Sequence, residues 1–485
     1  MTTLIKNGLV YDGSGNEPVK TDIFIRGERV TKLGSELKMK TARVIDANGA
    51  IVMPGFIDIN TNSDHYLSLF NSPEQKDFIR EGVTTIIGGN CGVSLAPILR
   101  GHKKINVHWQ SVANFLDVLE KKGVGVNFGT LIGYTTIRKF VAPGNFGDFT
   151  NKEIELSKKV LAQAFKDGAF GFSTDLTNSQ TGKIALHEIK ELTSVTAAHH
   201  KIYAVHLKNY EAELGDAVNE IIQISRETHV NTEVSHFTPT KNFAALYTEA
   251  ASIIEKNSAE SWISFDFPVA DSTVNDLITF LPEWLKNENF SATLEKVLSK
   301  TFEKRILEHL ESFSNEEITI GHVAEPSLKF LEGKNLRVYA ESRGENFGNA
   351  FLELARLTKL KAVLFRKNVD LPTLEKLYAL PNSIIASNGA SFKSKEFNFE
   401  RNYPTFLTFL KTASEKNILP FEKAVMKITA LPAKKYGILK RGLIKENYFA
   451  DIVVMKDFKP IEVLINGRQV LGTLEKAGKI LRSKK

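Results

Sequence analysis

One thiol and two imidazoles are the side chains of this sequence best suited to hold a metal ion. Cys91 follows the apolar run VTTIIGGN, His206 lies in KIYAVHL, and His236 lies in NTEVSHF. A thiolate and two imidazoles with a vacant fourth position are typical ligands of a catalytic zinc ion, which lowers the pKa of its bound water towards about 7. Their spacing alone is a weak signal, because a lone cysteine is more often a small buried hydrophobe and a histidine at a strand end is more often simply hydrogen-bonded. A zinc site therefore requires a fold that brings the three together.

Eight apolar runs, each followed by a helical pattern, supply such a fold. Residues 153–168 and 213–229 are examples of the helical patterns, with apolar positions three and four apart. This alternation predicts a (β/α)8 barrel of the TIM type, an α/β fold whose active site lies at the carboxyl ends of its strands. Cys91, His206 and His236 all fall at such ends, which favours one shared zinc site. The runs are IVMPGFIDIN, VTTIIGGN, NFGTLIGY, GAFGFST, KIYAVHL, NTEVSHF, SWISFDFP and SIIASNG.

The two ends of the chain predict a second, smaller part. Residues 1–50 alternate apolar and polar positions between turn signals, and ADIVVMKDF and EVLINGRQVLG repeat this pattern near the carboxyl end. We expect residues 1–50 and 433–485 to form one β-sandwich domain and residues 51–432 to form the barrel. An insertion around residues 274–380 carries several helical patterns and could act as a lid, and the strand-like EITIGH within it could compete for a place in the barrel.

Composition narrows the classes of function. The chain has 485 residues, 42% hydrophobic and 25% charged, as in ordinary soluble globular proteins. It shows no apolar run of membrane-spanning length, and MTTLIKNGLVYDG lacks the apolar core of a signal peptide. The net charge of +7 comes from 63 basic residues dispersed among 56 acidic ones, which indicates a solvated surface rather than a nucleic-acid site. A single cysteine excludes an intramolecular disulfide bond and favours a cytoplasmic location.

A set of motifs carries a family resemblance. The chain contains, in this order, PGFID, EGVTTIIGGNCGVSLAP, DGAFGFST, YAVHLK, VSHF, LPEW, KITALPA and VLINGR. On these motifs it resembles the D-aminoacylase (N-acyl-D-amino-acid deacylase) branch of the amidohydrolase superfamily over nearly its whole length. GVTT followed by GNCG and SLAP is quite specific to this branch. The resemblance implies a zinc-bearing barrel with a small β-sandwich built from both termini.

The resemblance also implies a substrate and a set of site residues. The family hydrolyses N-acylated D-amino acids, so we expect a small-molecule N-acyl amino acid or a related amide as the substrate. The family's tightly held zinc falls on Cys91, His206 and His236, and we expect one ion. Lys208 takes the position of a basic residue that could meet the substrate carboxylate, although a solvated lysine is the simpler interpretation. The family's HPRxYGTF stretch is replaced by FERNYPTF, which retains Arg401 and Tyr403 as candidate substrate-binding residues.

The chain departs from the family at the active centre. The HxH motif of the second, weaker metal position is replaced by Asn60 and Asn62, so that position has lost both imidazoles. The catalytic aspartate of the SDG motif is replaced by Asn388, and an amide cannot take a proton from water at neutral pH. Core motifs persist while these polar positions change together, a pattern that random drift over the whole chain would not produce.

Three interpretations of function follow from these departures. The sequence favours an active hydrolase in which one zinc ion activates water and Lys208 and Arg401 anchor an acidic substrate. The alternative is a catalytically silent homologue that binds a ligand or partner without turnover. Different chemistry on the same barrel is a third, because a fold does not fix the reaction.

An active enzyme needs a replacement for the lost general base. Asp64 and His65 are the nearest candidates in the sequence, ahead of Asp266 and His322, although a loop cap and a surface histidine are the simpler interpretation of the first two. A further hypothesis is that Asn388, which precedes a glycine, deamidates in a flexible loop and so regenerates an aspartate.

Overall fold

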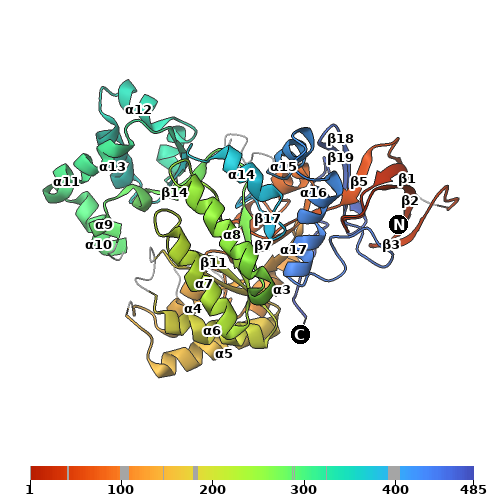
Figure 1. Ribbon diagram of the computed structural model, residues 1–485, viewed down its shortest axis with the longest axis horizontal. Coiled ribbons are helices and arrows are strands. Elements are labelled where there is room, and N and C mark those ends of the chain that lie inside the picture. Colours follow the sequence, from red (N-terminus) through yellow and green to blue (C-terminus); the bar gives the residue numbers. More distant parts are fainter. Residues whose placement is uncertain are drawn as a thin grey trace.

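The computed structural model describes residues 2–40, 43–98, 109–145, 147–177, 184–286, 288, 290–323, 325–391 and 405–484. Figure 1 shows three parts side by side: a helical insertion, a central barrel, and a small sheet that holds the amino-terminal strands. Within these described ranges, every helix is too short or too polar to cross a membrane.

Parallel strands form the barrel in the described part of the chain. Two sheets, in the orders β6-β7-β8 and β9-β10-β11-β12-β13-β17, join at β8 and β9 because only Leu131 separates these segments. The remaining edges meet where the nitrogen of Asn388 donates to the oxygen of Asn60 (2.8 Å) and the nitrogen of Asn62 donates to the oxygen of Gly389 (2.7 Å). The predicted (β/α)8 fold is confirmed. Its strands are β6 (Phe56–Asp58), β7 (Val83–Gly88), β8 (Asn127–Thr130), β9 (Ile132–Gly133), β10 (Gly171–Asp175), β11 (Ile202–His206), β12 (Asn231–Val234), β13 (Ile263–Phe267) and β17 (Ser383–Ile385).

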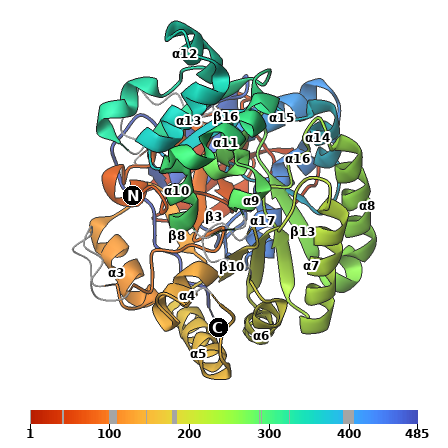
Figure 2. The same cartoon turned by 90° about the vertical axis from the view of Figure 1, so that its left-hand side faces the viewer.

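Helices surround these strands, as Figure 2 shows from the side of the insertion. Helix α5 (Asn151–Asp167) begins with a capping box, in which Thr150 and Glu153 each accept the other's backbone N–H, and ends at Gly168 with a φ of +113°. The helices predicted over 153–168 and 213–229 are confirmed as α5 and α7. The set comprises α1 (Ser68–Asn71), α2 (Lys76–Glu81), α3 (Val112–Lys122), α4 (Tyr134–Val141), α6 (Leu186–Ala198), α7 (Leu214–Thr228), α8 (Ala244–Ser261), α14 (Leu371–Tyr378), α15 (Thr405–Glu415), α16 (Phe421–Lys427) and α17 (Ala430–Lys435).

The small sheet combines strands from both ends of the chain. Strand β5 pairs with β18 in antiparallel register, with Val52 opposite Val454. The apolar run IVMPGFIDIN therefore divides between two sheets, β5 in the small sheet and β6 in the barrel. It divides at Gly55, where a β-carbon would lie 2.2 Å from the Thr84 side chain. The eight strands in the described ranges are β1 (Thr2–Val10), β2 (Val19–Arg26), β3 (Arg29–Gly34), β4 (Arg43–Asp46), β5 (Ile51–Pro54), β18 (Ile452–Lys456), β19 (Lys459–Ile465) and β20 (Arg468–Gln469).

The insertion has a sheet and an apolar core of its own. Strand β15 (Ile318–Val323), which includes the EITIGH run except for Glu317, pairs antiparallel with β16 (Ala362–Arg366), so it takes no place in the barrel. A separate cluster of buried side chains, including Phe280 and Phe351, lies between this sheet and its helices. Helix α14 falls within the range 274–380 yet packs against α8 of the barrel. The other elements are β14 (Thr273–Asp276), α9 (Glu283–Lys286), α10 (Phe290–Leu298), α11 (Glu303–Leu310), α12 (Leu336–Ser342), α13 (Phe347–Leu357) and the 3-10 turns η1 (Leu277–Phe280), η2 (Lys300–Phe302), η3 (Glu311–Phe313) and η4 (Pro326–Leu331).

Candidate metal centre

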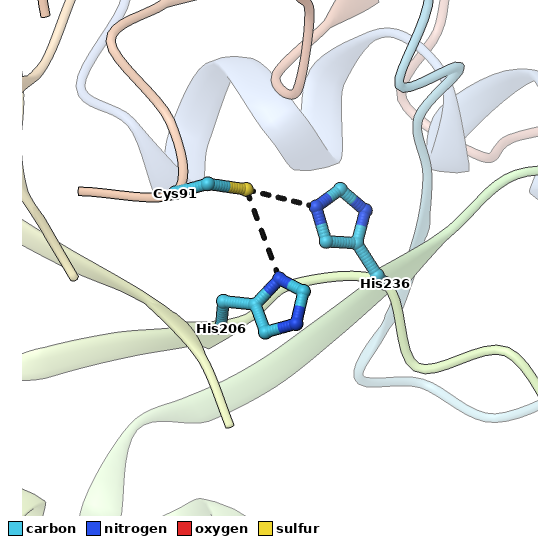
Figure 3. A group of neighbouring side chains, drawn as sticks. All are labelled: Cys91, His206 and His236. Atoms are coloured by element: carbon cyan, nitrogen blue, oxygen red, sulfur yellow. Dashed lines mark hydrogen bonds between the residues drawn. The ribbon is translucent and has the colours of Figure 1, made fainter. Parts of the chain in front are cut away.

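Cys91, His206 and His236 lie together at the carboxyl ends of three barrel strands (Figure 3). The Sγ atom of Cys91 is 3.8 Å from Nδ1 of His206 and 3.0 Å from Nε2 of His236. Their ligand atoms all lie within 4.8 Å of one another, and no other group of this kind occurs among the described residues. A tetrahedral ion bound at about 2.3 Å to sulfur and about 2.0 Å to nitrogen holds these atoms roughly 3.6 Å apart. The observed separations lie on either side of that value, so the three side chains fit one zinc ion.

Two of these three residues have a left-handed backbone. Cys91 has a φ of +50° and His236 a φ of +57°, which are uncommon for residues other than glycine and persist where neighbours impose them. Before Cys91, the N–H of Gly89 donates to Oδ2 of the buried Asp64 (2.7 Å). The N–H of His236 donates to Oδ1 of Asp266 (3.2 Å). Two buried carboxylates therefore hold the chain segments that present the thiol and one imidazole.

The amide nitrogen of Asn60 is bound within the protein, whereas its Oδ1 is buried without a hydrogen-bond partner among the described residues. Its Nδ2 lies 3.2 Å from both carboxylate oxygens of Asp266. Burial raises the pKa of Asp266, against the hydrogen bonds that it accepts from His236 and Asn60. Burial likewise raises the pKa of Asp58 to about 7, although Asp58 accepts hydrogen bonds from Ser387 and from the N–H of Asn60. The acidic groups behind the centre are thus buried and hydrogen-bonded.

Asn62 and Asn388 bind each other. Nδ2 of Asn62 donates to Oδ1 of Asn388 (2.6 Å) and to its backbone oxygen (2.8 Å). Deamidation of Asn388 requires the nitrogen of Gly389 to attack the side-chain amide, but that nitrogen donates to Oγ of Ser387 (2.9 Å). These hydrogen bonds hold both the amide and the attacking nitrogen, which disfavours deamidation, and the deamidation hypothesis stays a prediction.

The residues expected to bind substrate are only partly placed. Lys208 is exposed, and its Nζ donates to Oε2 of Glu220 on α7 (2.7 Å), so it lies in an ion pair at the strand end. Arg401 and Tyr403 fall outside the described residues.

The candidate replacement bases have structural partners. Asp64 holds the N–H of Gly89, and Nε2 of His65 lies 3.1 Å from the oxygen of Val93. His322 lies in β15 of the insertion, where its ring contacts that of Tyr66 edge-on. Sequence reasoning missed the partnership of Asp266 with Asn60, because 206 positions separate the two and no spacing signals it.

The comparisons with known proteins point to one group of enzymes. The chain matches no protein-family model. It is 28% identical to a D-aminoacylase of Alcaligenes xylosoxydans xylosoxydans over 93% of this chain and 87% of that protein. It is 26% identical to the N-acyl-D-aspartate deacylase of the same organism over 96% of this chain and 91% of that protein.

Solved structures show the same fold. An N-acyl-D-glutamate deacylase of Bordetella bronchiseptica, complexed with zinc and a phosphonate inhibitor, superposes with a TM-score of 0.82 at 23% identity over 99% of both chains. A D-aminoacylase whose binuclear centre shows one-metal activation and second-metal attenuation superposes with a TM-score of 0.79 at 24% identity, again over 99% of both chains. The chain is therefore a homologue of the D-aminoacylases and N-acyl-D-amino-acid deacylases, the amidohydrolase branch that its motifs resemble.

Proposed function

We propose that this protein is a hydrolase that cleaves the amide bond of an N-acyl amino acid with one zinc ion. The observation that carries the proposal is the convergence of Cys91, His206 and His236 at the carboxyl ends of the barrel strands in a homologue of deacylases. A thiolate and two imidazoles leave one coordination position open, as catalytic zinc sites do. When bound there, zinc would supply a Lewis acid for the amide carbonyl and lower the pKa of a water molecule.

The two asparagines of the former HxH motif support a single ion. Asn60 directs its amide nitrogen to Asp266, and Asn62 directs its own to Asn388. Both amides thus donate hydrogen bonds within the protein, and neither residue supplies the imidazole nitrogen of the former HxH motif. One-metal activation in a D-aminoacylase makes a single-ion enzyme chemically reasonable.

Asn388 favours a second candidate function, a homologue that binds an N-acyl amino acid without turnover. Its amide forms a hydrogen-bonded pair with Asn62 and offers no group that accepts a proton. Loss of a general base typically slows a reaction by about 10²–10⁴-fold. If zinc can activate water without a general base, we expect a slow enzyme. If it cannot, we expect a protein that binds an N-acyl amino acid without hydrolysing it.

Metal analysis tests the site. We expect about one zinc ion per purified chain, the stoichiometry of a site of this type, and its loss in Cys91→Ala. The matched control is His187→Ala, which removes an exposed histidine on α6 and should leave the zinc content unchanged. A wild-type protein that takes up no zinc would contradict the proposal.

Turnover and binding assays separate the two candidate functions. The zinc-loaded protein is given N-acetyl-D-amino acids with acidic and apolar side chains, and the released amine is measured, with the L-enantiomers as controls. Slow release from D-substrates that disappears in Cys91→Ala supports the hydrolase. Binding by calorimetry with no release from any compound supports the silent homologue instead.

A further inference from the structure

We infer that Tyr210 is a positioning residue that sets the separation of the two zinc-binding histidines, an inference that rests on the proposed function. Tyr210 lies four positions after His206 and none of the motifs includes it. Its hydroxyl accepts the N–H of Leu207 (3.0 Å) and donates to the backbone oxygen of Ser235. Leu207 follows one histidine and Ser235 precedes the other. A single side-chain oxygen therefore joins the two peptides that carry His206 and His236.

The hydroxyl occupies the place of a missing rung in the barrel sheet. Strands β11 and β12 are parallel neighbours, and the last regular hydrogen bond between them runs from the nitrogen of Ser235 to the oxygen of Val205 (2.8 Å). In a parallel ladder the next bond would run from the nitrogen of Leu207 to the oxygen of Ser235. Tyr210 intercepts this bond, because its hydroxyl accepts from that nitrogen and donates to that oxygen.

The intervening hydroxyl keeps the carboxyl ends of β11 and β12 apart where His206 and His236 leave the sheet. A direct bond would bring Leu207 and Ser235 to ordinary ladder distance, whereas an intervening oxygen adds a second hydrogen bond in series. His206 and His236 now have ring centroids 5.2 Å apart, and the ring of Tyr210 contacts His206 edge-on at 5.0 Å. The hydroxyl of Tyr210 thus acts as a spacer between the two strands, and its ring packs against the imidazole of His206.

Helix α8 holds the spacer in place. The hydroxyl of Tyr247 donates to the backbone oxygen of Tyr210 (3.0 Å), and the ring of Tyr247 packs edge-on against Phe237, the residue after His236. A phenol hydroxyl can donate one hydrogen bond and accept others, so the Tyr210 hydroxyl serves both backbone groups at once.

The test compares Tyr210→Phe with Tyr203→Phe. Tyr203 lies on β11, the strand that ends at His206, is fully buried, and bonds Oγ1 of Thr174 (2.7 Å) rather than either ligand peptide. Zinc affinity is measured by competition with a chromogenic chelator, and the thiolate-to-metal absorption is recorded after loading with Co²⁺. We expect Tyr210→Phe to bind zinc about 10- to 100-fold more weakly and to change the Co²⁺ spectrum, as loss of an outer partner of a metal ligand does. Tyr203→Phe should change neither.

The outcomes separate this inference from the proposed function. If the wild-type chain takes up no zinc, the zinc site itself fails and the role of Tyr210 fails with it. If the wild type binds zinc and Tyr210→Phe binds it equally well with an unchanged Co²⁺ spectrum, only the role of Tyr210 is overturned. Should Tyr210→Phe fail to fold, Tyr247→Phe is measured instead, because it keeps the spacer hydroxyl but removes its support. We expect Tyr247→Phe to show a smaller loss of zinc affinity, and wild-type affinity in that variant would overturn the inference.

Discussion

Asn388 follows β17 at its carboxyl end, and an aspartate could replace it without any rearrangement of the neighbouring residues. Nδ2 of Asn62 donates to Oδ1 of Asn388 at 2.6 Å, and the same donor would serve a carboxylate oxygen equally well. We expect Asn388→Asp to fold like the wild type and to raise the rate of N-acyl amino acid hydrolysis by about 10²-fold or more, the usual contribution of a general base. The measurement is kcat of the zinc-loaded variants.

The control for this prediction is Asn388→Ala, which removes the amide without supplying a base and should be no faster than the wild type. The rate of Asn388→Asp should fall at acidic pH as the new carboxylate takes up a proton. A zinc-loaded Asn388→Asp protein that is as slow as the wild type would show that the missing carboxylate does not limit turnover.

Asp58 makes stability depend on pH near neutrality. Its pKa is about 7 in the folded chain because it is buried, whereas an unfolded aspartate has a pKa near 3.9. Between these values the folded state holds the extra proton, so Asp58 favours folding below about pH 4 and loses this contribution as the pH rises through 7. With about 1.4 kcal/mol per pKa unit, the loss is on the order of a few kcal/mol. The free energy of unfolding by urea should differ less between pH 5 and pH 8 in Asp58→Asn than in the wild type. Equal differences in the two proteins would show that Asp58 is not the source of the pH dependence.

At the scale of elements, the loop after β7 depends on a glycine. Gly89 has a φ of +77°, and a β-carbon there would lie 2.3 Å from the backbone oxygen of Leu131. Gly89→Ala should therefore displace the loop that carries Cys91 and abolish zinc binding, as measured by metal content. Gly144 is the matched control, because it has a φ of +84° but no atom within 4 Å of the added carbon. Gly144→Ala should cost only the left-handed strain, roughly 1–3 kcal/mol, and keep its zinc.

The strand ends were predictable from the sequence, and with them the grouping of Cys91, His206 and His236. Apolar runs followed by polar residues mark where buried strands reach solvent, which located Cys91, His206 and His236 without any distance information. The division of IVMPGFIDIN at Gly55 was not predictable, because both halves are apolar and the cause is the close approach of Thr84.

Contacts that lack periodicity also escaped prediction. Lys208 pairs with Glu220 on the following helix, and Asn60 pairs with Asp266 across the barrel. Neither pair has a characteristic spacing, since the first depends on where the loop after β11 places α7 and the second on how the barrel closes. The spacer role of Tyr210 belongs to the same class, because it depends on a ladder bond that is absent from one strand pair.

At the scale of the whole molecule, a buried ion pair joins the small sheet to the barrel. Arg441 and Asp451 are 4% and 5% exposed and form an ion pair, and Asp451 also accepts hydrogen bonds from the side chain of Asn127 in β8 and the N–H of Asn466. Asn466 in turn donates to Asn127 (2.9 Å). The network spans sequence separations of more than 300 residues, so the barrel and the small sheet should unfold together.

Arg441→Met tests this coupling, because it leaves the carboxylate of Asp451 buried without its cation. Breaking a buried ion pair in this way costs about 3–5 kcal/mol, so the midpoint of urea unfolding should fall sharply. The control is Lys158→Met, which breaks surface pairs with Glu155 on α5 and Glu191 on α6 and should cost at most about 1 kcal/mol. We expect a single transition for the wild type by both tryptophan fluorescence and circular dichroism. Two separate transitions in the wild type, or equal losses of unfolding free energy in the two variants, would show that the network does not couple the sheet to the barrel. A single wild-type transition, with a large loss of unfolding free energy only in Arg441→Met, would show that the sheet and barrel are stabilised as one unit.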